Sequence, residues 1–223
     1  SSAASDVYKR QAMGARLLRT YVEQPLIEKA EIIKRQKLIE ALNANEITRD
    51  EIREYLNPIY DLERLITRIT YQSANPRDLI AFRDSLKMLP PIKQQLSDIP
   101  CELTDEINEE FDELKDIYEL LLSSIEDEPP ISQRDGDIIK AGYNEEVDRL
   151  RDAKTKGKTW LAKLEAGERE KTGIKNLRIK YNKVFGYYLE VTNSFKDMVP
   201  DYYVRKQTLT NAERYITPEL KEL

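Results

Sequence analysis

The stretch from position 205 to position 214 concentrates side chains that can hold a phosphate. Its cations, hydroxyl and amide are Arg205, Lys206, Thr210, Asn211 and Arg214. Thr210 and Glu213 have the spacing of a capping box, which predicts that a helix begins here. Free N–H groups and the positive dipole end at a helix start favour phosphate. Such contacts hold a backbone without reading bases. Capping together with solvated charge explains the same residues equally well.

Three other patterns only partly match known chemical sites. Gly157, Lys158 and Thr159 match the end of a phosphate-binding P-loop, but Asp152 stands where that motif needs a glycine. The carboxylates at positions 102–128 lack the alternating Asp, Asn and Gly order of a calcium loop, which favours a solvated helix face. Cys101 has no basic neighbour to lower its pKa, so we expect an inert thiol.

The composition excludes several kinds of site. With no His among 223 residues, a Ser/His or Cys/His triad and an HExxH zinc site are impossible. A single Cys forms neither an internal disulfide nor a thiolate zinc cluster, and it fits a reducing compartment. No apolar run approaches about 20 residues, which predicts a cytoplasmic chain with no membrane partner. We expect no catalytic residue, no cofactor and no bound metal in this chain.

The net charge of −5 is unevenly distributed along the chain. Positions 171–214 hold nine of the 36 Lys and Arg residues but only four of the 41 Asp and Glu residues. Positions 102–128 hold twelve acidic residues and one Lys. This reversal of sign predicts an acidic body followed by a basic module.

The acidic body shows the periodicity of helices. Apolar residues recur at a spacing near 3.6 from Met13 onward, which predicts a helical bundle. One helix is predicted to continue from Thr104 to Leu121. Helix starts are predicted at Thr48, Asn75 and Thr104. Positions 1–11 show no apolar period and are expected to be a disordered leader or a foreign scar.

A long polar helix is predicted to lead from the bundle to the basic module. Asn144 is expected to cap it, and its 28 positions up to about Lys171 would reach about 42 Å. Beyond Gly173 the period changes to 2, which predicts a hairpin with one apolar and one basic face and a turn at Lys183. A third strand is predicted at positions 201–209.

Two further features of the basic module are open to interpretation. Tyr187 and Tyr188 could stack on bases, but alternating aromatic residues on a strand more often form core. Thr217 and Pro218 predict a helix start close to the last residue, so we expect the chain to be a fragment.

Several ordered motifs carry a family resemblance. Positions 173–177 (GIKNL), 181–191 (YNKVFGYYLEV) and 205–221 (RKQTLTNAERYITPELK) closely resemble the clamp of the MutS family of DNA mismatch-repair proteins. Five upstream motifs resemble the core domain of that family in the same order. They are 13–19 (MGARLLR), 24–26 (QPL), 60–65 (YDLERL), 74–79 (ANPRDL) and 134–136 (RDG).

This resemblance implies a mainly α fold, in which a helical bundle sends out a long lever helix that carries a small β-rich clamp at its tip (α+β). It divides the chain into a core at 12–145, the lever helix and DNA clamp at 146–212, and the truncated start of a returning lever helix at 213–223. Residues 1–11 have no counterpart in the family.

The resemblance also implies a function without catalysis. Clamps of this family hold duplex DNA, including mismatched duplex, through sequence-independent backbone contacts. The candidate contact residues are Lys183, Arg205, Lys206, Thr210, Asn211 and Arg214. The mismatch-reading and P-loop motifs of the family are missing here, so ATP and Mg²⁺ are expected only in the ATPase domain of a longer protein. A second subunit, a MutL-like repair partner and a nucleoid location in bacterial cytoplasm are implied for that protein.

Two alternatives remain open. In the first, the chain is a structural or interaction module whose acidic helices dock a protein partner or second subunit while the basic tip stays solvated. In the second, it belongs to the MutS paralogues that lack mismatch recognition, although these usually lack a clamp of this kind.

Overall fold

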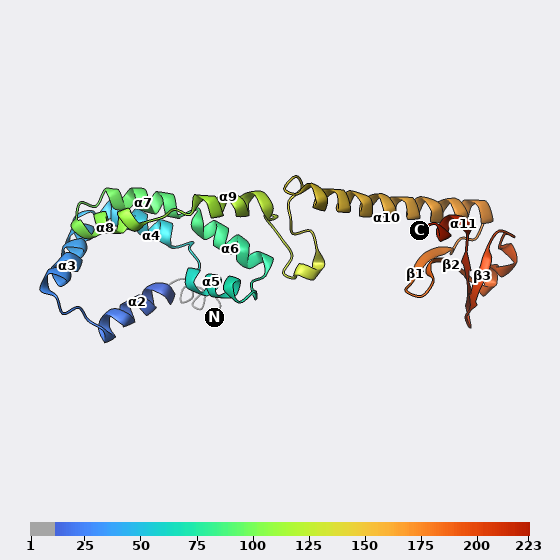
Figure 1. Ribbon diagram of the computed structural model, residues 1–223, viewed down its shortest axis with the longest axis horizontal. Coiled ribbons are helices and arrows are strands. Elements are labelled where there is room, and N and C mark those ends of the chain that lie inside the picture. Colours follow the sequence, from blue (N-terminus) through green and yellow to red (C-terminus); the bar gives the residue numbers. More distant parts are fainter. Residues whose placement is uncertain (1–11) are drawn as a thin grey trace. The chain divides into compact units, whose positions relative to one another are not determined.

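The computed structural model describes residues 12–223 and divides into two compact units (Figure 1). One unit ends at Tyr143 and the other comprises Asn144–Leu223. Helices dominate, and the described strands form one four-stranded sheet, which confirms the mainly α fold with a small β part. The predicted leader or scar at residues 1–11 lies outside the described residues. None of the described helices combines the length and the apolar character needed to cross a membrane.

The main elements of the first unit are all helices. Its helices are α2 (Ala12–Glu23), α3 (Lys29–Ala44), α4 (Glu46–Leu56), α5 (Leu62–Thr70), α6 (Pro76–Leu86), α7 (Leu89–Ser97), α8 (Glu102–Glu110) and α9 (Lys115–Ser124), with a short 3₁₀ helix η1 (Gln133–Asp135). Helices α5, α6 and α9 enclose a core of Leu65, Phe82, Leu86, Leu121 and Ile125. Helix α4 packs on α7, and α8 packs on both α3 and α7.

The predicted helix starts in this unit have different outcomes. The cap at Asn75 is confirmed, since its side chain accepts from Asp78 N at 2.9 Å and Asp78 Oδ2 accepts from Asn75 N at 2.9 Å. The cap at Thr48 is wrong, because α4 begins at Glu46 with Asn45 as its N-cap. Asn45 also ends α3, so the two helices follow each other without a loop in which Thr48 could act.

The predicted helix from Thr104 to Leu121 is also wrong in two respects. Thr104 is fully buried inside α8, and its hydroxyl lies 2.6 Å from the Ile99 carbonyl oxygen. The helix then breaks, because Leu114 adopts a left-handed φ of 52° before α9 begins. Lys93 Nζ donates to the Phe111 carbonyl at 2.8 Å. Apolar residues keep helical spacing across this break, so periodicity alone cannot detect it.

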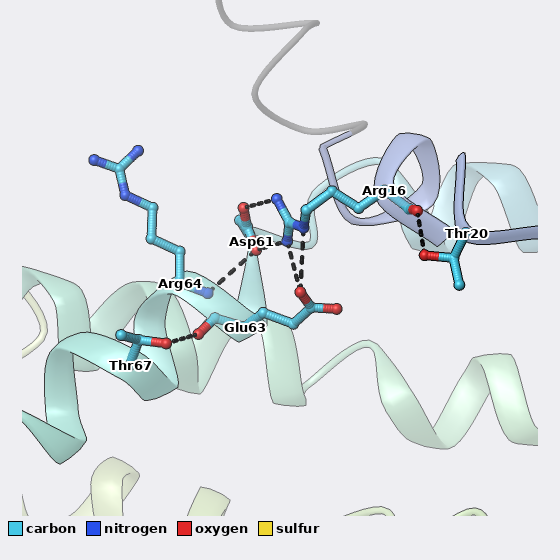
Figure 2. Close-up of polar contacts among 6 residues, drawn as sticks. All are labelled: Arg16, Thr20, Asp61, Glu63, Arg64 and Thr67. Atoms are coloured by element: carbon cyan, nitrogen blue, oxygen red, sulfur yellow. Dashed lines mark hydrogen bonds and ion pairs between the residues drawn. The ribbon is translucent and has the colours of Figure 1, made fainter. Parts of the chain in front are cut away.

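One arginine ties α2 to the start of α5 (Figure 2). Arg16 donates to both carboxylate oxygens of Asp61, at 2.7 and 3.0 Å, and to Glu63 Oε2 at 3.0 Å. Asp61 is the N-cap of α5 and accepts from Arg64 N at 3.2 Å. The hydrogen bond from Arg16 holds the pKa of Asp61 below its ordinary value. None of the residues of α2 is buried, and this polar contact joins the exposed helix to α5.

The second unit combines a long helix with the sheet. Its elements are α10 (Glu145–Thr172), β1 (Arg178–Asn182), β2 (Gly186–Thr192), the 3₁₀ helix η2 (Asn193–Met198), β3 (Val204–Thr208), β4 (Ala212–Ile216) and α11 (Pro218–Lys221). The strands are antiparallel in the order β1-β2-β4-β3. Their core contains Ile174, Leu177, Leu189, Val191, Tyr203, Tyr215 and Leu220.

Most predicted elements of this unit are confirmed. Asn144 caps α10 by accepting from Val147 N at 3.1 Å, and the helix has the expected 28 residues. The β1–β2 hairpin and the third strand are present. Thr217 caps α11 through its hydroxyl.

Candidate nucleic-acid interface

Thr210 and Asn211 lie in a tight turn between β3 and β4, and the helix predicted to start at Thr210 is wrong. Positions 212–216 form a central strand instead, in which Glu213 lies between Val191 of β2 and Thr208 of β3. Leu209 N donates to Ala212 O at 2.8 Å and closes the turn. Pairing on both sides outweighs the local capping signal, so no helix dipole serves a phosphate here.

The turn itself leaves its side chains available. Asn193 donates from its backbone N to Asn211 O and from Nδ2 to Thr210 O, both at 3.0 Å. Within residues 12–223 the side chains of Thr210 and Asn211 are exposed and make no hydrogen bond. A hydroxyl and an amide are therefore free to donate to a ligand.

The adjoining strand β3 presents two cations on a sheet edge. All five of its residues are exposed. The ladder shifts register between Arg205 and Gln207, so Lys206 lies in a bulge. The side chain of Arg205 is 64% exposed, and its Nη1 lies 3.7 Å from Glu213 Oε1. Lys206 has no ion-pair partner in the described part of the chain.

Arg214 has a different environment, although the sequence placed it with the other cations. Its guanidinium lies 4.6 Å from the centre of the Tyr188 ring and donates to Gln207 Oε1 at 2.9 Å. Its Nε lies 3.5 Å from Glu190 Oε2 without forming a hydrogen bond, and its side chain is only 20% exposed. Arg205 pairs with Tyr215, so alternation places Arg214 on the opposite face from Arg205. Arg214 therefore chiefly holds the sheet together.

Lys183 lies far from Thr210 and Asn211. It is exposed in the turn between β1 and β2. That turn precedes Gly186 at the start of β2, whereas the 210–211 turn adjoins Thr192 at its end, which pairs with Ala212. Six residue-to-residue steps along β2 separate these ends by about 20 Å. Lys183 and the 210–211 turn therefore lie at opposite ends of β2, while Arg205 and Arg214 lie between them, level with Leu189 and Glu190.

The basic face predicted for the first hairpin is present. Arg178 and Lys180 are exposed on β1, and Lys180 donates to Glu190 Oε1 at 2.9 Å. Tyr188 lies between Arg214 and Phe185, whose ring centre is 5.4 Å from that of Tyr188. Tyr188 is buried and Tyr187 packs, partly buried, against the core, so the interpretation of both as core is confirmed. The Tyr188 ring is not available for stacking on bases.

Residues 12–223 contain no group of three or more His, Cys, Asp or Glu side chains that could hold a metal ion.

Comparison with known proteins places the chain in a family. Residues 10–216 match the family model described as MutS domain III. The chain belongs to the MutS family. The resemblance seen in the sequence motifs is thereby confirmed.

Curated MutS proteins match nearly the whole chain. The DNA mismatch repair protein MutS of Lachnoclostridium phytofermentans is 63% identical over 214 residues, which are 96% of this chain and 23% of that protein. The protein of the same name from Caldanaerobacter subterraneus subsp. tengcongensis is 58% identical over 211 residues, which are 95% of this chain and 24% of that protein. The chain thus spans roughly a quarter of the length of these MutS relatives.

Two carboxylates of this MutS segment escaped the sequence analysis. Glu165 and Glu168 lie near the end of α10, where they contact residues at the two edges of the sheet. No local signal sets them apart from the other carboxylates of α10, because their partners lie in β1 and just before β3.

Proposed function

We propose that this MutS segment holds the backbone of duplex DNA, matched and mismatched alike. The observation that carries the proposal is the pair of exposed cations, Arg205 and Lys206, on edge strand β3, beside a turn with unused side-chain donors. Charged groups and donors of this kind contact phosphates and position a protein without reading bases. The names of the relatives, which are DNA mismatch repair proteins, support the same reading.

The candidate residues take unequal parts in this proposal. Arg205 and Lys206 supply the charge, while Thr210 and Asn211 donate to phosphate or sugar oxygens from the adjacent turn. Lys183 contacts a separate phosphate from the other end of the sheet. Arg214 acts mainly by keeping Gln207 and Tyr188 in place.

Further roles belong to the longer MutS protein rather than to this segment. We propose that it pairs with a second MutS subunit and a MutL-like repair partner in the bacterial cytoplasm, on the nucleoid. ATP and Mg²⁺ would be bound by an ATPase domain outside these residues. The family membership of the chain supports these proposals.

A titration of duplex DNA at several salt concentrations tests the backbone contacts. Each neutralised phosphate contributes about −0.9 to the log-log salt slope, so Lys183, Arg205 and Lys206 together predict about −2.7. Lys206→Glu should weaken matched and mismatched duplexes equally. Lys37→Glu makes the same charge change at an exposed lysine of α3 and should have little effect.

Three results would contradict the proposal. A titration without salt dependence would remove the phosphate contacts altogether. A loss confined to mismatched duplex would give Lys206 a role in reading bases. If duplex binding fails and a protein partner instead protects positions 102–128 from hydrogen exchange, the chain is an interaction module.

Arg214→Gln separates a structural role from phosphate contact. Because Arg214 is engaged by Gln207, Tyr188 and Glu190, its loss should lower the stability of the sheet and leave the salt slope unchanged. If Arg214→Gln makes the log-log salt slope less negative by about 0.9, Arg214 neutralises a phosphate.

A further inference from the structure

The end of α10 carries two carboxylates that contact opposite edges of the sheet. Glu165 Oε2 accepts from the backbone N of Ile179 in β1 at 2.9 Å. Glu168 Oε2 accepts from the hydroxyls of Tyr202 and Tyr203, at 2.7 and 2.8 Å, just before β3 begins. In the order β1-β2-β4-β3, strands β1 and β3 are the two edges. Glu165 and Glu168 are one helical turn apart, so one short piece of helix holds both edges.

The contact at Glu168 lies in the interior of the unit. Glu168 is 4% exposed and Tyr203 is 6% exposed. A carboxylate is costly to bury unless it is hydrogen-bonded, and here two hydroxyls and Lys171, 3.8 Å away, satisfy it. Burial and the bond to Glu168 raise the pKa of Tyr202 to about 12 and also raise that of Tyr203. Both hydroxyls therefore remain donors at neutral pH.

The contact at Glu165 is reinforced by arginines. Arg169 pairs with Glu165 and donates from Nε to the Leu177 carbonyl at 2.8 Å. Arg178 Nη1 lies 3.5 Å from Glu165 Oε1. The helix is thus bonded at several points to the chain that enters β1. Within α10, Glu165 also forms an (i, i+4) pair with Arg169 and Glu168 an (i, i+3) pair with Lys171, so each carboxylate links its own helix to the sheet.

We propose that Glu165 and Glu168 form a two-point mount that fixes the orientation of α10 relative to the sheet, so that helix and sheet move as one body. Glu168 is also a positioning residue for β3, because Tyr203 is two positions before Arg205. The mount rests on contacts within the second unit alone. Its effect on DNA rests on the proposed function.

A pair of spin labels in the full chain tests the mount. Cysteines replace Lys158 on α10 and Thr208 on β3, with Cys101→Ser as background. We expect a narrow distance distribution that broadens in Glu168→Ala and further in Glu165→Ala/Glu168→Ala. Glu168→Gln, which retains an acceptor oxygen, should recover a narrower distribution. Glu170→Ala removes an exposed carboxylate of the same helix and should change nothing.

Hydrogen exchange at Leu189 reports whether the sheet stays folded in each variant. If Glu168→Ala unfolds the sheet, Tyr202→Phe and Tyr203→Phe serve as the test variants instead, because each removes only one hydrogen bond to Glu168. An equally narrow distribution in a folded variant that lacks these bonds would overturn the mount.

Duplex affinity separates this inference from the proposed function. With Glu168→Ala we expect about a tenfold loss of affinity at an unchanged salt slope, since the phosphate contacts are misplaced rather than removed. A broadened distribution with unaltered affinity and slope would keep the mount and reject the role of β3 in binding. Absence of duplex binding in the unaltered chain would defeat the proposed function and leave the distance measurement valid.

Discussion

At the residue scale, the partners of an arginine decide what its charge does. Arg205 is well exposed and only loosely paired with Glu213. Arg214, nine residues later, is enclosed by Tyr188, Gln207 and Glu190. A guanidinium can satisfy several acceptors and an aromatic face at once, which suits it to this bracing position. Local sequence does not distinguish the two residues, because their partners lie on other strands.

The ion pair of Arg16 and Asp61 predicts a change of stability with pH. Because the folded pKa of Asp61 lies below its ordinary value of 3.8, its contribution is fully present above that value and is lost as the pH falls through the folded pKa. Arg16→Gln should therefore be less stable than the unaltered chain near pH 6. The difference in stability between the two proteins should shrink as the pH falls below about 4 in urea unfolding.

Arg19→Gln is the matched control for this measurement. Arg19 pairs with Glu23 on the same helix, with both side chains largely exposed, so its loss should change little at either pH. A stability difference for Arg16→Gln that does not decrease as the pH falls below about 4 would contradict the coupling to Asp61.

At the scale of elements, one glycine sets the end of α10. Gly173 adopts a left-handed φ of 73° and its N–H bonds to Arg169 O, so it is the C-cap of the helix. A Cβ atom at this position would lie 3.1 Å from Met198 Cε. The helix thus ends one turn beyond Glu168, and from there the chain leads to β1.

Gly173→Ala should lower the free energy of unfolding of the second unit by about 1–2 kcal/mol, because a side chain strains the left-handed backbone. Gly157→Ala, with open space around it in the middle of α10, should instead stabilise by about 0.5–1 kcal/mol. Chemical denaturation followed by circular dichroism measures both. If both substitutions change the free energy of unfolding equally, the left-handed backbone of Gly173 is not the cause of the destabilisation.

At the scale of the whole molecule, each compact unit has its own apolar core. Leu86 is 1% exposed in the core of the first unit, and Leu189 is fully buried in that of the second. Neither core includes residues of the other unit. The two units can therefore lose stability separately.

Leu86→Ala and Leu189→Ala form a matched pair that tests this separation. Each should cost about 2–5 kcal/mol, because each leaves a cavity in a packed core. Hydrogen exchange resolved by residue should show faster opening only in the unit that carries the substitution. If either substitution accelerates exchange in both units, they unfold as one cooperative body.

The sequence by itself determined the features that depend on neighbours along the chain. The long α10 with its cap at Asn144, the N-cap at Asn75 and the first hairpin followed from spacing within a few residues. The motifs also sufficed for the family. Side-chain periodicity and caps are local, so they are visible before folding.

Only the tertiary structure decided what depends on distant partners. Thr210 and Glu213 match a capping box, yet ladders with β2 and β3 make positions 212–216 a strand. The strand register places Lys183 and the 210–211 turn at different ends of β2. Residues of the neighbouring strands enclose Arg214. Glu168 finds Tyr202 and Tyr203 more than thirty positions away. Pairing and burial across such separations outweigh local preference, because they satisfy backbone and charged groups that water no longer reaches.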